Sequence, residues 1–521
     1  ATFAQVADVR QDATAATRAR QTASLGTLDV NAPASFEDAR RGLIATPSGQ
    51  VRNAQGQVVW DFDALRFAQG EAPPTVHPSL WRQARLNQTP GLYQVREGIW
   101  QLRGFDLANL TLIQGRTGWI VVDPLTTQET AAAALAFARQ HLGAQPVSGL
   151  VFTHSHVDHF GGVRGVIDEA DVLAGRVQVI APVGFMEDAI SETVMAGNAM
   201  TRRALFQYGA LLPRGERGQV DAGLGKAVSA GTVTLIAPNR LITQSVESFE
   251  VDGIECVFEL TPGAEAPAEM IIHHPGLRVL NMAEITSHNF HNLLPLRGAQ
   301  VRDARAWAGY LAGARQRYAA HSDVLIAQHH WPVWGSQSMG EYLLRQHDLY
   351  KFVHDQTLRL MNHGHTGGDI AEAMRTRLLA TAQEAVDEDG WPAPARGPSR
   401  AWVFTSATLG HDAELSWFVK RCGLEGARIL RVESPFDYST QAGFFVPQDF
   451  PSPSDPQHGP SVAALAAQAA ATLGGRTLVL TTTLRALGVI ASTLREELAK
   501  HGALLEVLVQ GEWPKLLLTR A

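Results

Sequence analysis

Apolar runs that suit β-strands alternate with helical patterns along the chain from about residue 90. "GIWQLRG" and "LTLIQGRTGWIVVDPL" predict consecutive strands separated by turn residues. "QETAAAALAFARQHLG" predicts a helix over 128–143 with Gly143 at its C-terminal cap. The strand pattern continues in "VSGLVF" (147–152), "FEVDGIECVFELTPG", "LRVLNMAEI" and "DVLIAQHHWPVWG", and helices are expected over 303–321 and 339–364. Strands mixed with helices in this order predict a layered α/β core.

Composition narrows the class of protein. With 521 residues, two or three domains are expected rather than one core. A net charge of −7 argues against a protein that coats nucleic acid or an anionic membrane, and no apolar stretch is long enough to span a bilayer. Cys256 and Cys422 form neither a metal pattern nor a disulfide framework, and we expect small buried side chains there. The opening "ATFAQVADVRQ" is either a mature N-terminus left after signal removal or an artificial start.

The stretch "THSHVDHFGG" concentrates metal-binding side chains directly after a predicted buried strand. His154, His156, Asp158 and His159 offer imidazole and carboxylate donors, which suit Zn²⁺ and similar ions. A polar surface turn is the plain alternative. Because the two following glycines mark a turn, we expect these residues on a loop at the strand's C-terminal end.

Three further residues follow strand-like runs and could complete a metal site. They are Glu265 in "PGAEAPAEM", Glu284 in "NMAEITSHN" and His329 in "IAQHHWPVWG". Taken singly, each is more often a satisfied structural residue than a ligand. Together with the first cluster they predict a metal centre built at several strand ends.

"THSHVDH" resembles the T-H-x-H-x-D-H motif of the metallo-β-lactamase superfamily, and "VVDPL" resembles its earlier aspartate motif. "FEDARRG", "GFDLANLTLI", "HNLLPLRGAQVRDARAW" and "DLYKFVHDQTLRLMNHG" are similar to the zinc-dependent alkylsulfatases of the SDS-hydrolase type, over about 35–373. The resemblance implies an αββα sandwich that binds two zinc ions. His154, His156 and Glu265 would bind one ion, Asp158, His159 and His329 the other, and Glu284 would bridge or complete the pair.

The same resemblance implies where the substrate binds. Asn292 and Arg297 match residues that hold the sulfate group, and with Asp158 they are the expected catalytic residues. A surface ion pair is the alternative for Arg297. The segments 183–200 and 204–213 are rich in Met, Phe and Leu; core packing is the default expectation there, and binding of an alkyl tail is the alternative.

The C-terminal region resembles a different family. "WVFTSATLG", "LRVESPFDYSTQAGFFVPQDFP" and "GGRTLVLTTTLRAL" are similar to the second motor domain of DinG-type DNA helicases, over about 398–521. A working motor needs a P-loop, and "GLGKA" (223–227) fails that pattern because Val220 replaces the first glycine and no Ser or Thr follows Lys226. We therefore expect a partial RecA-like α/β lobe that is passive rather than a motor.

These patterns together predict four parts and one main activity. The predicted parts are a metallo-β-lactamase-like catalytic domain with an N-terminal extension (1–335), the start of a helical, dimerisation-type segment (336–375), a linker (376–397) and the helicase-like lobe (398–521). The predicted activity is hydrolysis of alkyl sulfates such as dodecyl sulfate by a metal-activated hydroxide, on primary or secondary esters. Hydrolysis of another anionic ester and a DNA- or partner-binding fusion are the alternatives. A homodimer located in the periplasm or outside the cell is expected from the family, but the helical segment is incomplete here and no motif matches the family's residues for acid catalysis.

Overall fold

The computed structural model of the chain describes residues 11–25, 30–64, 66–374, 445–453, 455–475, 477–481, 483–502 and 505–509. The chain divides into two compact units, Ala1–Arg400 and Ala401–Ala521. The predicted linker 376–397, Cys422 and the "TSATL" motif lie outside the described residues. The predicted domain boundaries stay predictions.

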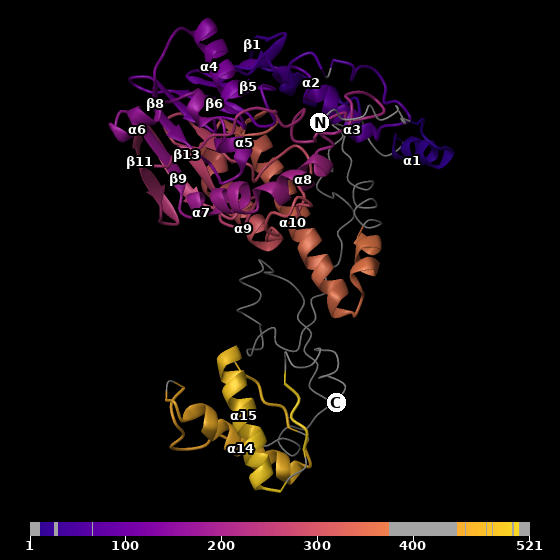
Figure 1. Ribbon diagram of the computed structural model, residues 1–521, viewed down its shortest axis with the longest axis vertical. Coiled ribbons are helices and arrows are strands. Elements are labelled where there is room, and N and C mark those ends of the chain that lie inside the picture. The colour runs from indigo at the N-terminus through magenta and orange to yellow at the C-terminus, as the bar shows by residue number, and fades with distance from the viewer. Residues whose placement is uncertain are drawn as a thin grey trace. The chain divides into compact units, whose positions relative to one another are not determined.

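The first unit contains an eight-stranded sheet (Figure 1). Its strands, in spatial order, are β1 (Leu43–Ala45), β4 (Gly91–Arg96), β5 (Ile99–Arg103), β6 (Leu110–Gln114), β7 (Trp119–Val122), β8 (Val147–Val151), β9 (Gln178–Pro182) and β10 (Arg240–Ile242). The strands from β1 to β7 pair antiparallel, and those from β7 to β10 pair parallel. The parallel part places the C-terminal ends of β7, β8 and β9 at one edge.

A second sheet of six strands packs against the first. Its strands, in order, are β11 (Val246–Val251), β12 (Ile254–Leu260), β13 (Met270–His274), β14 (Val279–Asn281), β15 (Val324–Ile326) and β16 (Val333–Trp334). β14 and β15 are parallel, and the other pairs are antiparallel. A separate hairpin joins β2 (Gln50–Arg52) and β3 (Val58–Asp61).

Helices cover the outer faces of the two sheets, and an apolar layer fills the space between them. Helix α4 (Gln128–Leu142) packs on the first sheet, whereas α9 (Ala304–Tyr318) and α10 (Ser336–Asn362) pack on the second. Between the sheets, Ile120 and Val122 belong to the same buried cluster as Phe258 and Ile272. This is the predicted αββα sandwich, and the three predicted helices are present.

The remaining helices are short and lie mostly before the sandwich or at its edges. They are α1 (Ala15–Leu25), α2 (Pro33–Arg40), α3 (Pro78–Leu86), α5 (Val157–Phe160), α6 (Glu169–Leu173), α7 (Phe185–Ile190) and α8 (Gly197–Gln207). In the second unit, α14 (His458–Leu473) and α15 (Leu484–Lys500) pack through Ala467, Ala470 and Leu498. Two helices do not distinguish a RecA-like lobe from other folds, so that assignment stays a prediction.

The histidine cluster departs from the expected loop in one respect. After β8 the chain is irregular as far as His156, and then α5 begins. Asp158 and His159 therefore lie on a helical turn, with the amide of His159 donating to the carbonyl of His156 at 3.1 Å. The turn is compact because Gly161 and Gly162 follow it directly.

We expect Gly162→Ala to destabilise the sandwich, because its Cβ would collide with the carbonyl oxygens of Pro124 and Thr127. Overpacking of this kind costs about 1–3 kcal/mol of unfolding free energy. Gly197→Ala is the control, since a Cβ there meets nothing within 4 Å. Chemical denaturation of both variants measures the effect, and equal stability of the two would contradict the close packing of this turn.

Candidate metal centre

All seven predicted ligands meet at one edge of the sandwich, where several strands end. His154 and His156 follow β8, and Asp158 and His159 lie on α5. The other three follow β12, β14 and β15, and they are Glu265, Glu284 and His329. All seven are buried except Asp158, whose side chain is 14% exposed.

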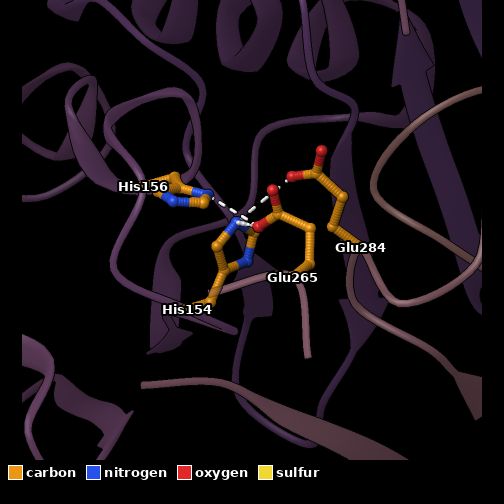
Figure 2. A group of neighbouring side chains, drawn as sticks. All are labelled: His154, His156, Glu265 and Glu284. Carbon is orange, nitrogen blue, oxygen red and sulfur yellow. Dashed lines mark ion pairs between the residues drawn. The ribbon is translucent and has the colours of Figure 1, made fainter. Parts of the chain in front are cut away.

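The first ligand group consists of His154, His156, Glu265 and Glu284, whose donor atoms lie within 4.8 Å of one another. Figure 2 shows the two imidazoles and the two carboxylates pointing toward a common centre. His156 Nδ1 lies 2.6 Å from Glu265 Oε2, and His154 Nε2 lies 3.2 Å from Glu284 Oε2.

The second group consists of Asp158, His159, Glu284 and His329. Glu284 Oε2 lies 3.0 Å from His159 Nε2 and 3.2 Å from His329 Nε2. Glu284 thus belongs to both groups, which is the arrangement expected of a ligand shared by two neighbouring ions.

The donor atoms suit a cation. Within the described part of the chain, the buried Nε2 atoms of His154, His159 and His329 face the Glu284 carboxylate without a well-formed hydrogen bond. Buried polar atoms rarely stay unsatisfied, and histidine and carboxylate donors in this number suit Zn²⁺ or a similar ion. A metal ion at each group would satisfy them.

The carboxylates remain charged despite burial. Burial raises the pKa of Glu265, but the Arg302 guanidinium and the neighbouring His156 together hold it below its usual range. Burial likewise opposes ionisation of Glu284 and Asp158, and neighbouring histidines hold both pKa values below the ordinary ones. These three carboxylates and the surrounding histidine nitrogens form a set of donors that favours binding of a divalent cation.

A further set of hydrogen bonds orients the histidine rings. His159 Nδ1 lies 2.8 Å from Asp123 Oδ2, and Asp123 also accepts from the amide of Thr153 at 2.8 Å. His329 Nδ1 lies 3.2 Å from the carbonyl oxygen of Leu107. Each contact occupies Nδ1 and leaves Nε2 directed at the centre, as is usual around metal-binding histidines.

The loop that carries Leu107 is itself fixed by a buried carboxylate, Asp106. Its oxygens accept from the Leu107 amide at 2.8 Å, from the Thr130 hydroxyl at 2.7 Å and from the Ser229 hydroxyl at 2.7 Å. The carbonyl that orients His329 is therefore held in place by this network.

Arg302 and His291 belong to the site although no sequence pattern singled them out. Arg302 pairs with the Glu265 carboxylate and donates to the carbonyls of Glu265 at 2.6 Å and Asn292 at 2.8 Å. His291 Nε2 lies 3.1 Å from Glu284 Oε1. Both residues lie in the quoted "HNLLPLRGAQVRDARAW" segment, but an arginine or a histidine in a loop has no spacing that would mark it as part of a metal site.

A cavity of about 220 Å³ opens beside the two ligand groups. Asn292 and Arg297 line it, as do His156, Asp158, Tyr208 and Phe290. Burial raises the pKa of Tyr208, and Asp158 raises it further, so its hydroxyl keeps its proton.

Arg297 lies in this cavity and is paired there rather than at the surface. Its Nη1 lies 2.6 Å from Glu192 Oε2, and both side chains are only 15% exposed. Arg297 does form an ion pair, but the pair is largely buried, so the alternative of a surface ion pair is wrong. Asn292 is held through its side-chain oxygen by Arg302.

The default expectation of core packing for 183–200 and 204–213 is wrong for most of their large apolar residues. These segments form α7, a π-helical turn (Ser191–Met195) and α8, in which only Phe185, Ala189 and Met200 are buried. Met195 is 82% exposed and Phe206 is 80% exposed. The adjoining Gln207 and Tyr208 line the cavity.

A family model of the metallo-beta-lactamase superfamily matches residues 103–329. The solved structure of the stereoselective inverting sec-alkylsulfatase Pisa1 from a Pseudomonas species is 49% identical, with a TM-score of 0.68 over 70% of this chain and 58% of that chain. Residues 103–329 have the metallo-β-lactamase fold.

Two curated relatives extend the likeness. Alkyl/aryl-sulfatase BDS1 from Saccharomyces cerevisiae is 51% identical over 342 residues, which are 65% of this chain and 53% of the relative. A linear primary-alkylsulfatase from a Pseudomonas species is 46% identical over 372 residues, 71% of this chain and 55% of the relative. The chain spans about half the length of these relatives.

A separate, shorter match concerns another family. The ATP-dependent DNA helicase YoaA from Escherichia coli is 35% identical over 115 residues, 22% of this chain and 17% of the helicase.

Within the described part of the chain, every helix is too short or too polar to cross a membrane.

Arg302→Met is expected to lower the unfolding free energy by about 3–5 kcal/mol, because it leaves the buried Glu265 carboxylate without its cation. Arg164→Met is the control, since its pair with Glu169 is exposed on both sides and exposed pairs contribute about 1 kcal/mol or less. Urea denaturation of the metal-free proteins compares the two. Equal losses would show that Arg302 does not offset the charge of Glu265.

Proposed function

We propose that this chain is a zinc-dependent hydrolase of alkyl sulfate esters such as dodecyl sulfate. Water and the ester R–O–SO₃⁻ would give the alcohol R–OH and hydrogen sulfate. The observation that carries the proposal is the pair of ligand groups sharing Glu284, beside a cavity lined by Asn292 and Arg297. The relatives at 46–51% identity, named as alkylsulfatases, support the same reaction.

In this proposal His154, His156 and Glu265 hold one zinc ion, and Asp158, His159 and His329 hold the other. Glu284 is the shared ligand. A bound zinc pair would supply a Lewis acid and bring the pKa of a water molecule toward about 7. Asp158 acts in catalysis by holding its ion at the cavity wall.

Arg297 and Asn292 would receive the sulfate group. A guanidinium offers paired donors to a compact anion and stabilises the charge that develops on the leaving sulfate. Glu192 holds Arg297 in place, and the protonated Tyr208 hydroxyl provides a further donor on the same wall. The exposed apolar side chains of the π-helical turn and α8 would bind the alkyl tail.

The type of ester, the compartment and the assembly are finer proposals. We propose linear primary alkyl sulfates as substrates, with secondary esters or another anionic ester as alternatives, because relatives named for primary and for secondary alkyl sulfates both align with this chain. A homodimer in the periplasm or outside the cell is proposed from the same resemblance.

For the C-terminal region we propose a helicase-like lobe without motor function. The 115-residue match to YoaA supports the relationship. The failed P-loop pattern at 223–227 and the net charge of −7 argue against ATP-driven work on nucleic acid.

Inorganic sulfate release from dodecyl sulfate by the whole chain, with added zinc and after chelation, tests the proposed reaction. We expect release that depends on zinc, and His156→Ala should lower it at least about 10²-fold because a ligand is lost. His365→Ala, which changes an exposed histidine on a distant turn, should leave the rate unchanged. Zinc-independent release, or full activity of His156→Ala, would refute the proposal.

Arg297→Met is expected to lower kcat/KM for dodecyl sulfate about 10²-fold, because the sulfate loses its cationic donor. Bound zinc, measured by elemental analysis, should stay at the wild-type level, since Arg297 contacts none of the seven ligands directly. Arg305→Met on the exposed face of α9 is the matched control. An unchanged kcat/KM in Arg297→Met would place the sulfate elsewhere.

A further inference from the structure

Glu269 is a fully buried carboxylate next to the metal centre that belongs to neither of its two ligand groups. It lies between Glu265 and β13 and directly precedes that strand, which pairs with β12 and β14. Its side chain is 0% exposed. A carboxylate at such a position must have a local partner, because burying it alone costs several kcal/mol.

The side chain of Glu269 accepts hydrogen bonds from both segments that carry acidic ligands. Its Oε2 accepts from the amides of Glu265 at 2.9 Å and Ala266 at 3.3 Å. Its Oε1 accepts from the amide of Glu284 at 3.3 Å. One carboxylate therefore joins the β12–β13 loop to the segment after β14.

The backbone around Glu269 joins the third ligand-bearing segment to these two. Glu269 and His154 form an isolated antiparallel bridge. The Ser155 amide donates to the carbonyl of Ala268 at 3.2 Å, and the Met270 amide donates to the carbonyl of Thr153 at 2.9 Å. The histidine segment of one sheet is thereby fixed to the acidic ligands of the other.

We propose that Glu269 is a positioning residue, whose carboxylate fixes Glu265 and Glu284 relative to His154 and so sets the affinity of the metal centre. This role shares with the proposed function the requirement that a metal ion binds at this site, and it does not depend on which ester is hydrolysed. It acts through the ligands and makes no contact with substrate.

The geometry of the contact requires an acceptor oxygen at both positions of the carboxyl group. Three backbone N–H groups point at two oxygens, and both oxygens must accept. A glutamine at this position has one oxygen and an NH₂ group, which would face a backbone N–H and repel it. Glu269→Gln therefore keeps the size of the side chain but holds only one of the two acidic segments.

Zinc affinity of the full chain tests this role, measured by competition with a chromophoric chelator and by elemental analysis. We expect Glu269→Gln to weaken zinc binding about 10–100-fold, as changes to groups that orient metal ligands commonly do. Glu269→Asp keeps both acceptor oxygens on a shorter chain, so its affinity should fall between those of Glu269→Gln and the wild type.

Glu259→Gln is the matched control. Glu259 is also a buried strand carboxylate, and it accepts from the Tyr318 hydroxyl at 2.8 Å and from Arg317 Nε at 3.1 Å, away from the ligands. This change should lower the Tm of the metal-free chain without altering zinc affinity. Wild-type zinc affinity in Glu269→Gln, or an equal weakening in Glu259→Gln, would overturn the proposal.

Two further outcomes are decided by the same measurements. If circular dichroism shows that Glu269→Gln does not fold, Glu269→Asp carries the test, and wild-type affinity in that variant overturns the role. If the wild-type chain binds zinc but releases no sulfate, the proposed function fails while a weakened affinity in Glu269→Gln still supports the positioning role.

Discussion

The site depends on the convergence of three carboxylates at the buried edge of the sandwich, where several strands end. Glu284 shares one ligand group with Glu265 and the other with Asp158, and burial works against the charge of each carboxylate. Like charges at this spacing repel, and no packing of apolar side chains would compensate for them. The neighbouring histidines and Arg302 reduce the repulsion, and the Nε2 atoms of three of these histidines converge on the Glu284 carboxylate, an arrangement of donors that suits a cation.

The αββα sandwich is what makes this convergence possible. His154 and His156 come from the end of a strand in one sheet, while Glu265, Glu284 and His329 come from strand ends in the other. The apolar layer between the sheets fixes their separation, because close-packed side chains such as Phe258 and Ile272 resist compression. Polar contacts outside the ligand shell then set the orientation of individual rings, as the bond from His159 to Asp123 illustrates.

Much of this arrangement could be predicted from the sequence, because its signals are local. "THSHVDH" places four donors within six positions, and the helix over 128–143 shows both its apolar spacing and its capping glycine. Arg302 could not be predicted in the same way, since its importance comes from a contact with Glu265, 37 positions away along the chain. The exposure of Met195 and Phe206 could not be predicted either, because apolar composition alone does not distinguish a helix in the core from a helix at the surface.

The pair between Arg297 and Glu192 bears on how a sulfate group would enter the cavity. Arg297 is largely buried, and its contact at 2.6 Å with Glu192 provides the counter-charge that a buried guanidinium needs. A sulfate that approached Arg297 would meet the negative charge of Glu192 as well, so affinity would come from the remaining guanidinium donors and from ions held at the ligand groups. Under the proposed function, two divalent cations at the ligand groups would reverse the local excess of carboxylate charge and attract the ester. Metal binding and anion binding would in this way be coupled through the same electrostatic field.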